Sequence, residues 1–421
     1  MKEHIGIIGT GVAGMGCAWN LRNHAQLTLL EKDARPGGHT NTVTVDEEGR
    51  TVPIDTGFIV FNKVTYPNLC RLFDELDVRI KPSEMSFSVQ HLPTGLEYNG
   101  MGLNKVFAQR RNVFRPRFHR FLQAIQQFFR VANALIQSPE GGEMTMREFV
   151  GQHRLGQDFL DLYLVPMSSA VWSTDPRIIL DFPARTLIRF FHNHGFLGVD
   201  THHPWFTVDG GAVTYRDKIL AAVGAPRLNA GAVRIEETPA CVRVTTMSGE
   251  ILEFDRVVVA AHGDEALRLL AAPDADQQRL LAPFRYQTNH ATLHTDETVM
   301  PRKRRAWASW NYRVTENGSA THYWMNALQG VSRNRNYFVS LNSEGRIPRD
   351  KVLYETTYQH PVFTVETTRA QQDLPSLNTR SPGQRIFFCG SYFRYGFHED
   401  AYTSGLQLAE VLQPLISANG R

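Results

Sequence analysis

The feature that most constrains the fold lies within the first forty residues, where two apolar runs flank a glycine-rich turn. The first run leads directly into Gly9-x-Gly11-x-x-Gly14, and after a helical pattern a second run, Leu27 to Leu30, ends on Glu31. This order of strand, glycine turn, helix, strand and acid is typical of a dinucleotide-binding unit. Gly9 permits the tight turn, Gly11 lets the backbone approach a pyrophosphate, and Gly14 lets the helix pack on the sheet.

The same segment predicts how a nucleotide is held. The helix presents free N–H groups and the positive end of its dipole to the phosphates. Glu31 lies at the distance from the turn at which an acid accepts hydrogen bonds from ribose hydroxyls. Its charge disfavours a 2′-phosphate, whereas the nearby Arg35 would favour one. The alternative is a Gly-rich turn without a ligand, but the complete strand–turn–helix–strand context favours the dinucleotide.

Composition places the chain among ordinary globular proteins. It has 421 residues, 42% of them hydrophobic and 21% charged, and this length suits two or three domains. The net charge of +3 is too small to predict a nucleic-acid partner. Four scattered cysteines without a CxxC pair indicate reduced thiols and a cytoplasmic protein. We expect no signal peptide and no membrane span, because no apolar stretch approaches about 20 residues.

Pieces of a nucleotide-binding unit recur along the chain. Later pieces are a short strand near Val233, a buried strand at 257–261, a strand at 385–390 and a helix from about Ala401. Between them, 101–136 and 145–195 have helical patterns, and 288–343 alternates apolar and polar residues as an antiparallel sheet does. Residues 52–60 indicate a strand broken by Gly57, and such a glycine often marks a ligand pressed against the backbone.

Together these residues resemble a known family. The stretches that carry the resemblance are GxGxxG, Glu31, RPGGHT at 35–40, DTGF at 55–58, the Val233 strand, VVVAAHGD at 257–264 and FFCGSYFRYGFHEDAYTSG at 387–405. They resemble the FAD-containing amine oxidoreductase superfamily, which includes monoamine oxidases, polyamine oxidases, protoporphyrinogen oxidases and carotenoid desaturases. Within it, the GFHED signature is similar to that of a bacterial subgroup of predicted NAD/FAD-binding oxidoreductases.

The resemblance implies an α/β fold. It has a Rossmann-like, glutathione-reductase-like FAD-binding domain and an inserted α+β substrate domain, which contains a mixed or antiparallel sheet and a helical insert. The FAD-binding domain is expected at 1–75, 204–265 and 376–421. The mainly helical part of the substrate domain is expected at 76–203, and its sheet at 266–375.

The resemblance also implies the cofactor, FAD, and the residues that hold it. The implied FAD-binding residues are Gly9, Gly11, Val12, Ala13, Gly14, Glu31, Lys32, Gly37, Gly38, His39, Thr40, Thr56, Gly57, Phe58, Val233, Gly390, Ser391, Glu399, Asp400 and Ala401. Covalent members attach flavin through a cysteine before the last strand, and the corresponding segment 359–363 has none. We therefore expect non-covalent FAD.

The densest group of titratable residues in the C-terminal signature is His398-Glu399-Asp400. Either His398 or Glu399 is a candidate to move a proton or to hold a substrate head group, and His360 is a further catalytic candidate. The alternative is that these residues only cap the last helix and contact the flavin. We expect no metal, because the spacing of His290 and His294 suits a helical ligand pair better than a strand.

The segment 101–136 combines seven basic residues, no acid and six phenylalanines. Its helical spacing predicts either an amphipathic helix packed on the core with a solvated basic face, or a helix lying on an anionic membrane. The second alternative would place the protein at the periphery of the inner membrane face.

Three functions agree with the sequence. The first is dehydrogenation of a hydrophobic, lipid-like substrate such as an acyl chain, because the segment 360–363 and Phe397 make a poor cage for an ammonium cation. The second is an amine oxidase that releases hydrogen peroxide. The third is a membrane-associated flavin-binding partner protein without turnover of its own. A small-molecule substrate and no nucleic acid are expected.

Overall fold

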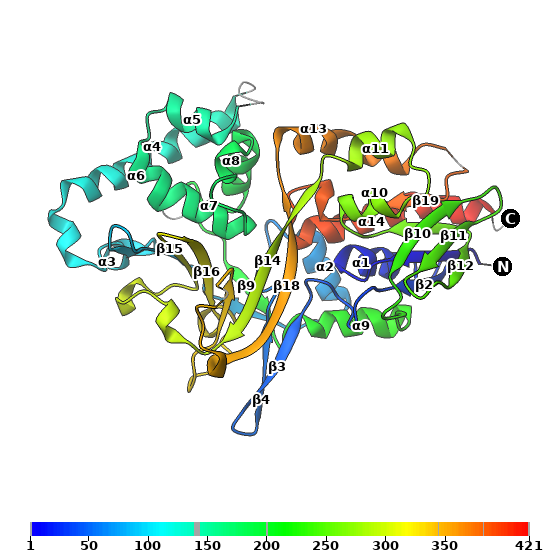
Figure 1. Cartoon of the computed structure of the whole chain (residues 1–421), viewed down its shortest axis with the longest axis horizontal. Helices are drawn as coiled ribbons and strands as arrows, with labels where there is room; N and C mark the ends of the chain where they lie inside the picture. The colour runs from blue at the N-terminus through cyan, green and yellow to red at the C-terminus, as the bar shows by residue number, and fades with distance from the viewer. Residues whose placement is uncertain (1, 139–143, 199–200, 344, 382, 420–421) are drawn as a thin grey trace.

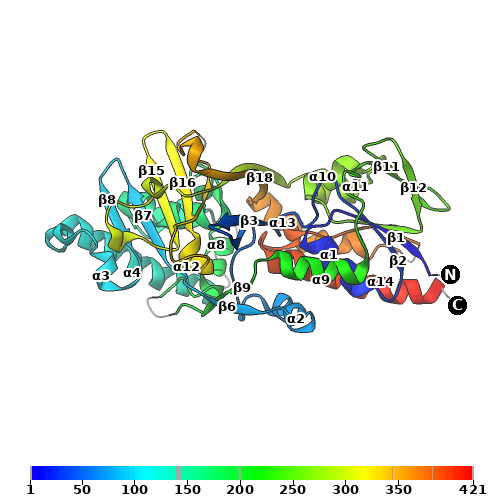
Figure 2. The same cartoon turned by 90° about the horizontal axis from the view of Figure 1, so that it is seen from below.

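The computed structural model describes residues 2–138, 144–198, 201–343, 345–381 and 383–419. A parallel sheet with its helices lies at one end of the molecule, together with both termini, and a larger sheet with a helical layer lies at the other (Figures 1 and 2). Each end is built from segments that lie far apart in the chain. This agrees with the α/β architecture expected from the sequence.

The parallel sheet is built from strands that are far apart in the chain. In spatial order they are β19 (Ile386–Phe388), β13 (Arg256–Val259), β1 (His4–Ile8) and β2 (Gln26–Leu30), all parallel. Helix α1 (Val12–Leu21) connects β1 to β2, and α9 (Val213–Val223) and α14 (His398–Asn419) pack against it. Helix α14 begins three residues before the predicted Ala401, directly after the chain turns at Gly396, whose φ is 90°.

Glycines let α1 lie unusually close to its neighbours. A Cβ at Gly14 would lie 2.1 Å from the carbonyl oxygen of Gly9, as the expected tight packing after the turn requires. A Cβ at Gly405 of α14 would lie 2.3 Å from the carbonyl oxygen of Ala13. The two helices therefore touch backbone to backbone, and this contact brings the C-terminal segment to the glycine turn.

A second core covers the other side of the parallel sheet. Antiparallel strands β10 (Ala232–Glu237), β11 (Val242–Thr246) and β12 (Ile251–Phe254) and helices α10 (Gly263–Leu269), α11 (Ala275–Leu281) and α13 (Val365–Asp373) lie there. Leu281, Phe284 and Leu374 pack in one cluster with Val257 and Phe388. Leu281, Phe284 and Leu374 therefore pack on the parallel sheet, although they lie within 266–375, the segment predicted to form the sheet of the substrate domain. The expected domain boundaries stay a prediction.

The larger sheet has seven strands. In spatial order they are β18 (Val352–Val362), β14 (Arg285–His294), β17 (Phe338–Leu341), β16 (Gly318–Trp324), β15 (Trp310–Thr315), β7 (Phe87–His91) and β8 (Leu96–Asn99). All neighbours are antiparallel except β15 and β7, which are parallel, so the sheet is mixed as expected.

The helical layer beside this sheet comes from 102–193. It contains α3 (Gly102–Val106), α4 (Pro116–Gln137), α5 (Met146–Gln152), α6 (Gln157–Phe159), α7 (Val165–Trp172) and α8 (Ala184–Asn193). Phe118, Phe121 and Phe128 of α4 are at most 5% exposed, so the phenylalanine face of this helix packs on the core. None of the described helices is long and apolar enough to cross a membrane.

Short elements join the two ends of the molecule. They are the hairpin β3 (Thr42–Glu47) and β4 (Arg50–Asp55), the small sheet of β5 (Phe61–Asn62), β9 (Trp205–Val208) and β6 (Ile80–Ser83), and helices α2 (Pro67–Glu75) and α12 (Met325–Gln329). The strand predicted over 52–60 ends at Asp55. A Cβ at Gly57 would lie 2.2 Å from the carbonyl oxygen of His39, so the close approach of this backbone alone requires a glycine, and contact of Gly57 with a ligand stays a prediction.

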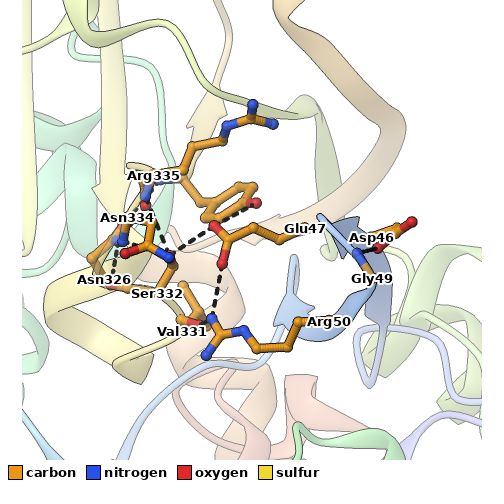
Figure 3. Close-up of polar contacts among 10 residues, drawn as sticks. Asp46, Glu47, Gly49, Arg50, Asn326, Val331, Ser332, Asn334 and Arg335 are labelled. Atoms are coloured by element: carbon orange, nitrogen blue, oxygen red, sulfur yellow. Dashed lines mark hydrogen bonds and ion pairs between the residues drawn. The ribbon is translucent and has the colours of Figure 1, made fainter.

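The tip of the β3–β4 hairpin is fixed to the loop after α12 (Figure 3). The buried carboxylate of Glu47 accepts hydrogen bonds from Ser332 Oγ at 2.7 Å and Tyr337 Oη at 3.1 Å, and it pairs with Arg50 at 3.0 Å. Arg50 also donates to the carbonyl oxygen of Val331 at 2.7 Å. This polar cluster holds the hairpin whose base leads into the segments 39–41 and 55–58.

Candidate functional site

A cavity of about 960 Å³ lies where the three parts of the parallel sheet meet the seven-stranded sheet. The turn 9–13 lines it from the N-terminal part, Val233 and the segment 260–262 from the middle, and the segments 390–392 and 395–398 from the C-terminal part. The carboxyl ends of β1, β13 and β19 point toward it, which is where open α/β sheets bind their ligands. The structure thus brings the three predicted nucleotide-binding pieces to one cavity.

Two glycine loops touch at the start of this cavity. Gly9 adopts φ 99° and donates its N–H to the carbonyl oxygen of Leu30 at 2.8 Å. Gly11 has open space where a side chain would lie, and a Cβ at Gly38 would come 3.4 Å from its Cα. Because Gly37 also has a positive φ, of 110°, this loop needs both of its glycines. The N-terminus of α1 therefore faces the cavity between two loops whose glycines leave room for a ligand.

Glu31 is buried beside this turn and lines the cavity. Its carboxylate accepts hydrogen bonds from the N–H and the hydroxyl of Thr10 and from the N–H of Asp33, the last at 3.1 Å. Thr10 Oγ1 in turn accepts from the N–H of Gly37 at 3.1 Å. Glu31 therefore joins the first glycine turn to the second loop, and its contact with a ribose stays a prediction.

Two buried donors of the second loop fit an anionic cofactor. Arg35 donates through Nη2 to the carbonyl oxygen of Gly38 at 3.0 Å, but its buried Nη1 has no partner among the described residues. The buried Nε2 of His39 also lacks one there. Both residues line the cavity. Unpaired buried polar atoms are rare in folded proteins, and a guanidinium beside a helix N-terminus suits a diphosphate. The residues present therefore fit FAD.

Farther along the cavity, His398 is held in a defined orientation. Its ring stacks on Phe58 with a centroid distance of 3.9 Å and an interplanar angle of 8°. Its Nε2 lies 2.5 Å from the hydroxyl of Tyr215, which lies 2.6 Å from Thr40 Oγ1. Tyr215 is fully buried in α9. Thr40, a predicted cofactor-binding residue, is thus linked through Tyr215 to His398, a predicted catalytic residue.

A second chain of contacts reaches His360. Tyr358 Oη hydrogen-bonds to Thr56 Oγ1 at 2.8 Å and accepts from Asn41 Nδ2 at 2.9 Å, and its ring stacks on His39. The rings of His39 and His360 lie 5.2 Å apart. Strand β18 therefore places its aromatic residues directly against the loop that follows the second glycine pair.

The histidines in the cavity are neutral at neutral pH. Burial lowers the pKa of His398 to about 3 and that of His360 to about 4, and it lowers the pKa of His39 well below its usual value. Desolvation disfavours the charged imidazolium in each case, and the cationic neighbours of His39 add to the effect. At pH 7 these rings can donate and accept hydrogen bonds but carry no charge.

Glu399 lies away from the cavity. Its carboxylate accepts from the N–H groups of Asn68 at 3.0 Å and Leu69 at 2.9 Å, in the first turn of α2. A carboxylate is well placed there, because the first N–H groups of a helix lack partners within it. Both carboxylate oxygens therefore accept hydrogen bonds from α2, and a role of Glu399 in moving a proton or binding FAD stays a prediction.

Asp400 is also buried and does not line the cavity. Its Oδ2 accepts from the N–H of Phe397 at 2.9 Å, and burial raises its pKa to about 7. It fixes the turn before α14 and so the position of the adjacent His398.

Most of the predicted site residues line the cavity. The exceptions are Gly14, Gly37, Thr40, Glu399 and Asp400, which pack behind the lining residues. Sequence reasoning did not include the cavity residues Tyr358 and Trp310, or Tyr215 and Asp55 behind them. Of these, only Asp55 had a signal, since it precedes the noted Thr56-Gly57-Phe58. Tyr215 had none, because its role depends on the contact of α9 with His398.

The part of the cavity formed by the seven-stranded sheet and the helical layer is aromatic. Its walls include Trp172, Phe190, Phe397, Trp310 and Tyr323. Phe397 stacks on Phe190 with a centroid distance of 4.6 Å. Among the described lining residues the only carboxylates are Glu31, Asp33 and Glu265, all of which belong to the parallel-sheet side. The aromatic part therefore offers a ligand aromatic surface without a carboxylate among the described lining residues.

Comparison with known proteins agrees with this geometry. Residues 12–330 match the model of the family described as flavin containing amine oxidoreductase. No match was found among curated proteins.

Several solved structures share the fold. Cyclohexylamine oxidase from Brevibacterium oxydans IH-35A has a TM-score of 0.71 at 15% identity, with 100% of each chain covered. The CLA-producing fatty acid isomerase from P. acnes has a TM-score of 0.68 at 14% identity, with 97% of this chain and 98% of that chain covered. Putrescine oxidase bound to putrescine has a TM-score of 0.68 at 14% identity, with 100% of each chain covered.

Proposed function

Since the chain belongs to the flavin-containing amine oxidoreductase family and is an FAD-dependent oxidoreductase, we propose that it dehydrogenates a hydrophobic, lipid-like substrate such as a fatty acyl chain. The observation that carries the proposal is the aromatic part of the cavity, in which no described lining residue is a carboxylate. An ammonium group buried there would lack a counter-charge, which is unfavourable. An acyl chain needs none.

The proposed reaction converts a CH₂–CH₂ unit into CH=CH. When bound, FAD supplies the acceptor for the hydride. The second hydrogen leaves as a proton, for which His360 is the proposed acceptor. We propose non-covalent FAD, held by the turn 9–14 with Glu31 and Lys32, by the loop 37–40, by Thr56, Gly57 and Phe58, and by Val233, Gly390, Ser391 and Ala401.

The residues of the cavity exclude water from the proposed reaction and hold the side chain of His398 in a fixed orientation. The aromatic walls exclude water around the reacting carbon, which a hydride transfer requires. His398 is proposed as a positioning residue, because Phe58 and Tyr215 fix its ring and its pKa of about 3 keeps it uncharged. An uncharged ring does not repel the cationic character that develops on carbon when hydride leaves.

A second candidate is an amine oxidase. It is supported by the similarity in fold to cyclohexylamine oxidase and putrescine oxidase. The neighbouring rings of His194, Trp172 and Phe397 also offer aromatic faces to a cation, although they pack mainly on one another.

One experiment separates these functions. The holoprotein is mixed without oxygen with dispersed phospholipid carrying saturated and monounsaturated acyl chains, or with cyclohexylamine or putrescine, and bleaching of the flavin absorption is followed. Reduction by the lipid, with loss of two hydrogens detected by mass spectrometry, supports dehydrogenation of an acyl chain. Reduction by amines alone, with hydrogen peroxide released on admission of oxygen, overturns it in favour of the oxidase.

We also propose that the protein meets its substrate at an anionic membrane surface through part of the segment 101–136. The phenylalanine face of α4 is buried, so this contact must use other residues of the segment.

A further inference from the structure

The end of the molecule farthest from both termini exposes large apolar side chains. We call residues 101–115 the distal tip; it contains α3 and the turn Arg110–Phe114 and leads into α4. Figures 1 and 2 both show α3 at the extremity opposite the chain ends. Phe114 is 87% exposed and Leu103 76% exposed, and Met101 and Val113 are also exposed. Four large apolar residues within fourteen positions make a protruding hydrophobic surface, which is unusual on a monomeric surface.

The exposed side chains lie close in the sequence to phenylalanines that are packed in a cluster. Phe107, Phe118 and Phe121 from the same region pack in one cluster with Tyr98, and the rings of Phe107 and Phe118 lie 5.5 Å apart. The chain therefore buries some phenylalanines of this segment and leaves Phe114 outside the cluster.

The distal tip is also strongly basic. Lys105, Arg110, Arg111 and Arg115 lie within it, and no acidic residue occurs anywhere between 101 and 137. None of its three arginines forms an ion pair with a described residue; Arg110 and Arg111 donate only to the neutral oxygens of Asn104, Phe107 and Gly95. Lys105 approaches Glu84 at 3.9 Å. The arginine charges are thus available to an external anion.

We propose that the distal tip docks the protein on an anionic lipid bilayer, with Phe114 and Leu103 entering the boundary between head groups and acyl chains. Arg110, Arg111 and Arg115 then lie at the level of the lipid phosphates. Exposed apolar side chains ringed by arginines are what an interfacial segment requires. A nucleic acid would use the arginines but would leave the aliphatic Leu103 exposed to water. The inference deepens the proposed function, which supplies the reason for a membrane contact.

Vesicle sedimentation tests the docking. The full-length holoprotein is mixed with vesicles of phosphatidylcholine alone or with added phosphatidylglycerol. We expect binding to the anionic vesicles only, weakened by salt. L103A/F114A should weaken it about tenfold or more, and R110Q/R111Q about fivefold for each charge removed. R234Q/R243Q changes two exposed arginines of β10 and β11, at the opposite end of the molecule, and should bind like the parent.

A second readout follows the insertion directly. In F114W, the tryptophan emission should shift to the blue and be quenched by brominated acyl chains when anionic vesicles are added. Equal loss of binding in R234Q/R243Q, no change in L103A/F114A, or retention of an added RNA instead of the vesicles would overturn the proposal.

The outcomes also separate docking from catalysis. Vesicle binding that follows this pattern while no lipid reduces the flavin supports the docking and rejects the acyl substrate. Flavin reduction by detergent-dispersed lipid without vesicle binding rejects the docking and leaves the acyl substrate supported.

Discussion

At the residue scale, the informative atoms are buried polar atoms without partners. Arg35 Nη1 and His39 Nε2 are buried at the cavity, and none of the described residues satisfies them. Sequence reasoning treated Arg35 only as a residue that could offset Glu31. In the structure Glu31 is instead bound to Thr10 and Asp33, so Arg35 is free to serve a phosphate. The position of Glu31 after the second strand was predictable from the spacing. The hydrogen bonds of its carboxylate to Thr10 and Asp33 were not.

We predict that Arg35→Gln weakens FAD binding by about 10- to 100-fold, because a hydrogen bond to a charged group contributes about 1.5–3 kcal/mol. The dissociation constant is measured by titrating apoprotein with FAD and following flavin fluorescence. Arg243→Gln, which alters an exposed ion pair with Glu253, is the matched control and should bind FAD like the parent. An unchanged dissociation constant for Arg35→Gln would show that its guanidinium does not contact the cofactor.

At the scale of elements, glycines decide how closely helices approach. Gly405→Ala would place a methyl group 2.3 Å from the carbonyl oxygen of Ala13 and push α14 away from α1. We expect a loss of about 1–3 kcal/mol of unfolding free energy or more, as for overpacked cores. FAD should also be released at a lower temperature, because α14 carries the segment next to the cavity. Thermal unfolding with flavin fluorescence measures both effects.

The control for this variant is Gly151→Ala. Gly151 lies inside α5 with no atom within 4 Å of the position of a Cβ. Alanine there should stabilise the protein by about 0.5–1 kcal/mol. If both variants changed the melting temperature in the same direction, the close contact of α1 and α14 would not be the cause.

The polar cluster at the tip of the β3–β4 hairpin gives another prediction for an element. Glu47→Ala leaves Ser332 and Tyr337 without their acceptor, and we expect a loss of about 1–3 kcal/mol, because unsatisfied buried groups are costly. Glu253→Ala removes a carboxylate from an exposed pair and should cost less than about 1 kcal/mol. Denaturant unfolding compares the two. Equal losses would mean that the hairpin tip contributes no more than a surface ion pair.

At the scale of the whole molecule, local patterns were predictable and contacts between distant segments were not. The strand–turn–helix of 4–21 is determined by its own glycines and apolar residues, so the sequence predicted it. The use of Glu399 by α2 depends on two segments separated by more than three hundred residues, and nothing near Glu399 indicates it. In the same way, helical spacing revealed the apolar face of α4 but could not show that Phe114 lies outside the core.

The balance of buried titratable groups sets how the whole molecule responds to pH. Burial lowers the pKa of His194, His294 and His360 to about 4 and that of His398 to about 3, and it lowers the pKa of His39 and His322 well below 6.5. In the unfolded chain these rings take up protons near pH 6.5. Below that value the unfolded state therefore binds more protons than the folded state, and stability falls as the pH falls.

Carboxyl groups with a raised pKa act in the opposite direction; they are Asp55, Glu237, Glu399 and Asp400. Burial raises the pKa of Asp55 to about 6 and that of Asp400 to about 7, so the folded state keeps protons that the unfolded chain loses above about pH 4. Their contribution therefore grows as the pH falls from 7 toward 4. Histidines with a lowered pKa, which include His91 and His262, outnumber the carboxyls with a raised pKa, so the sum favours loss of stability on acidification. Above about pH 7 the histidines lose few further protons in either state, whereas Asp400, with a pKa of about 7, still loses its proton up to about pH 8.

We therefore predict a melting temperature that changes little between about pH 7 and 8 and falls steadily from about pH 6.5 to 5, measured at constant ionic strength. His360→Asn should make the fall shallower, because the unfolded chain then takes up one proton fewer. His24→Asn, at an exposed position, is the control and should leave the slope unchanged. A melting temperature that rose on acidification would mean that Asp55 and Asp400 dominate, and that the histidines are solvated in the folded protein.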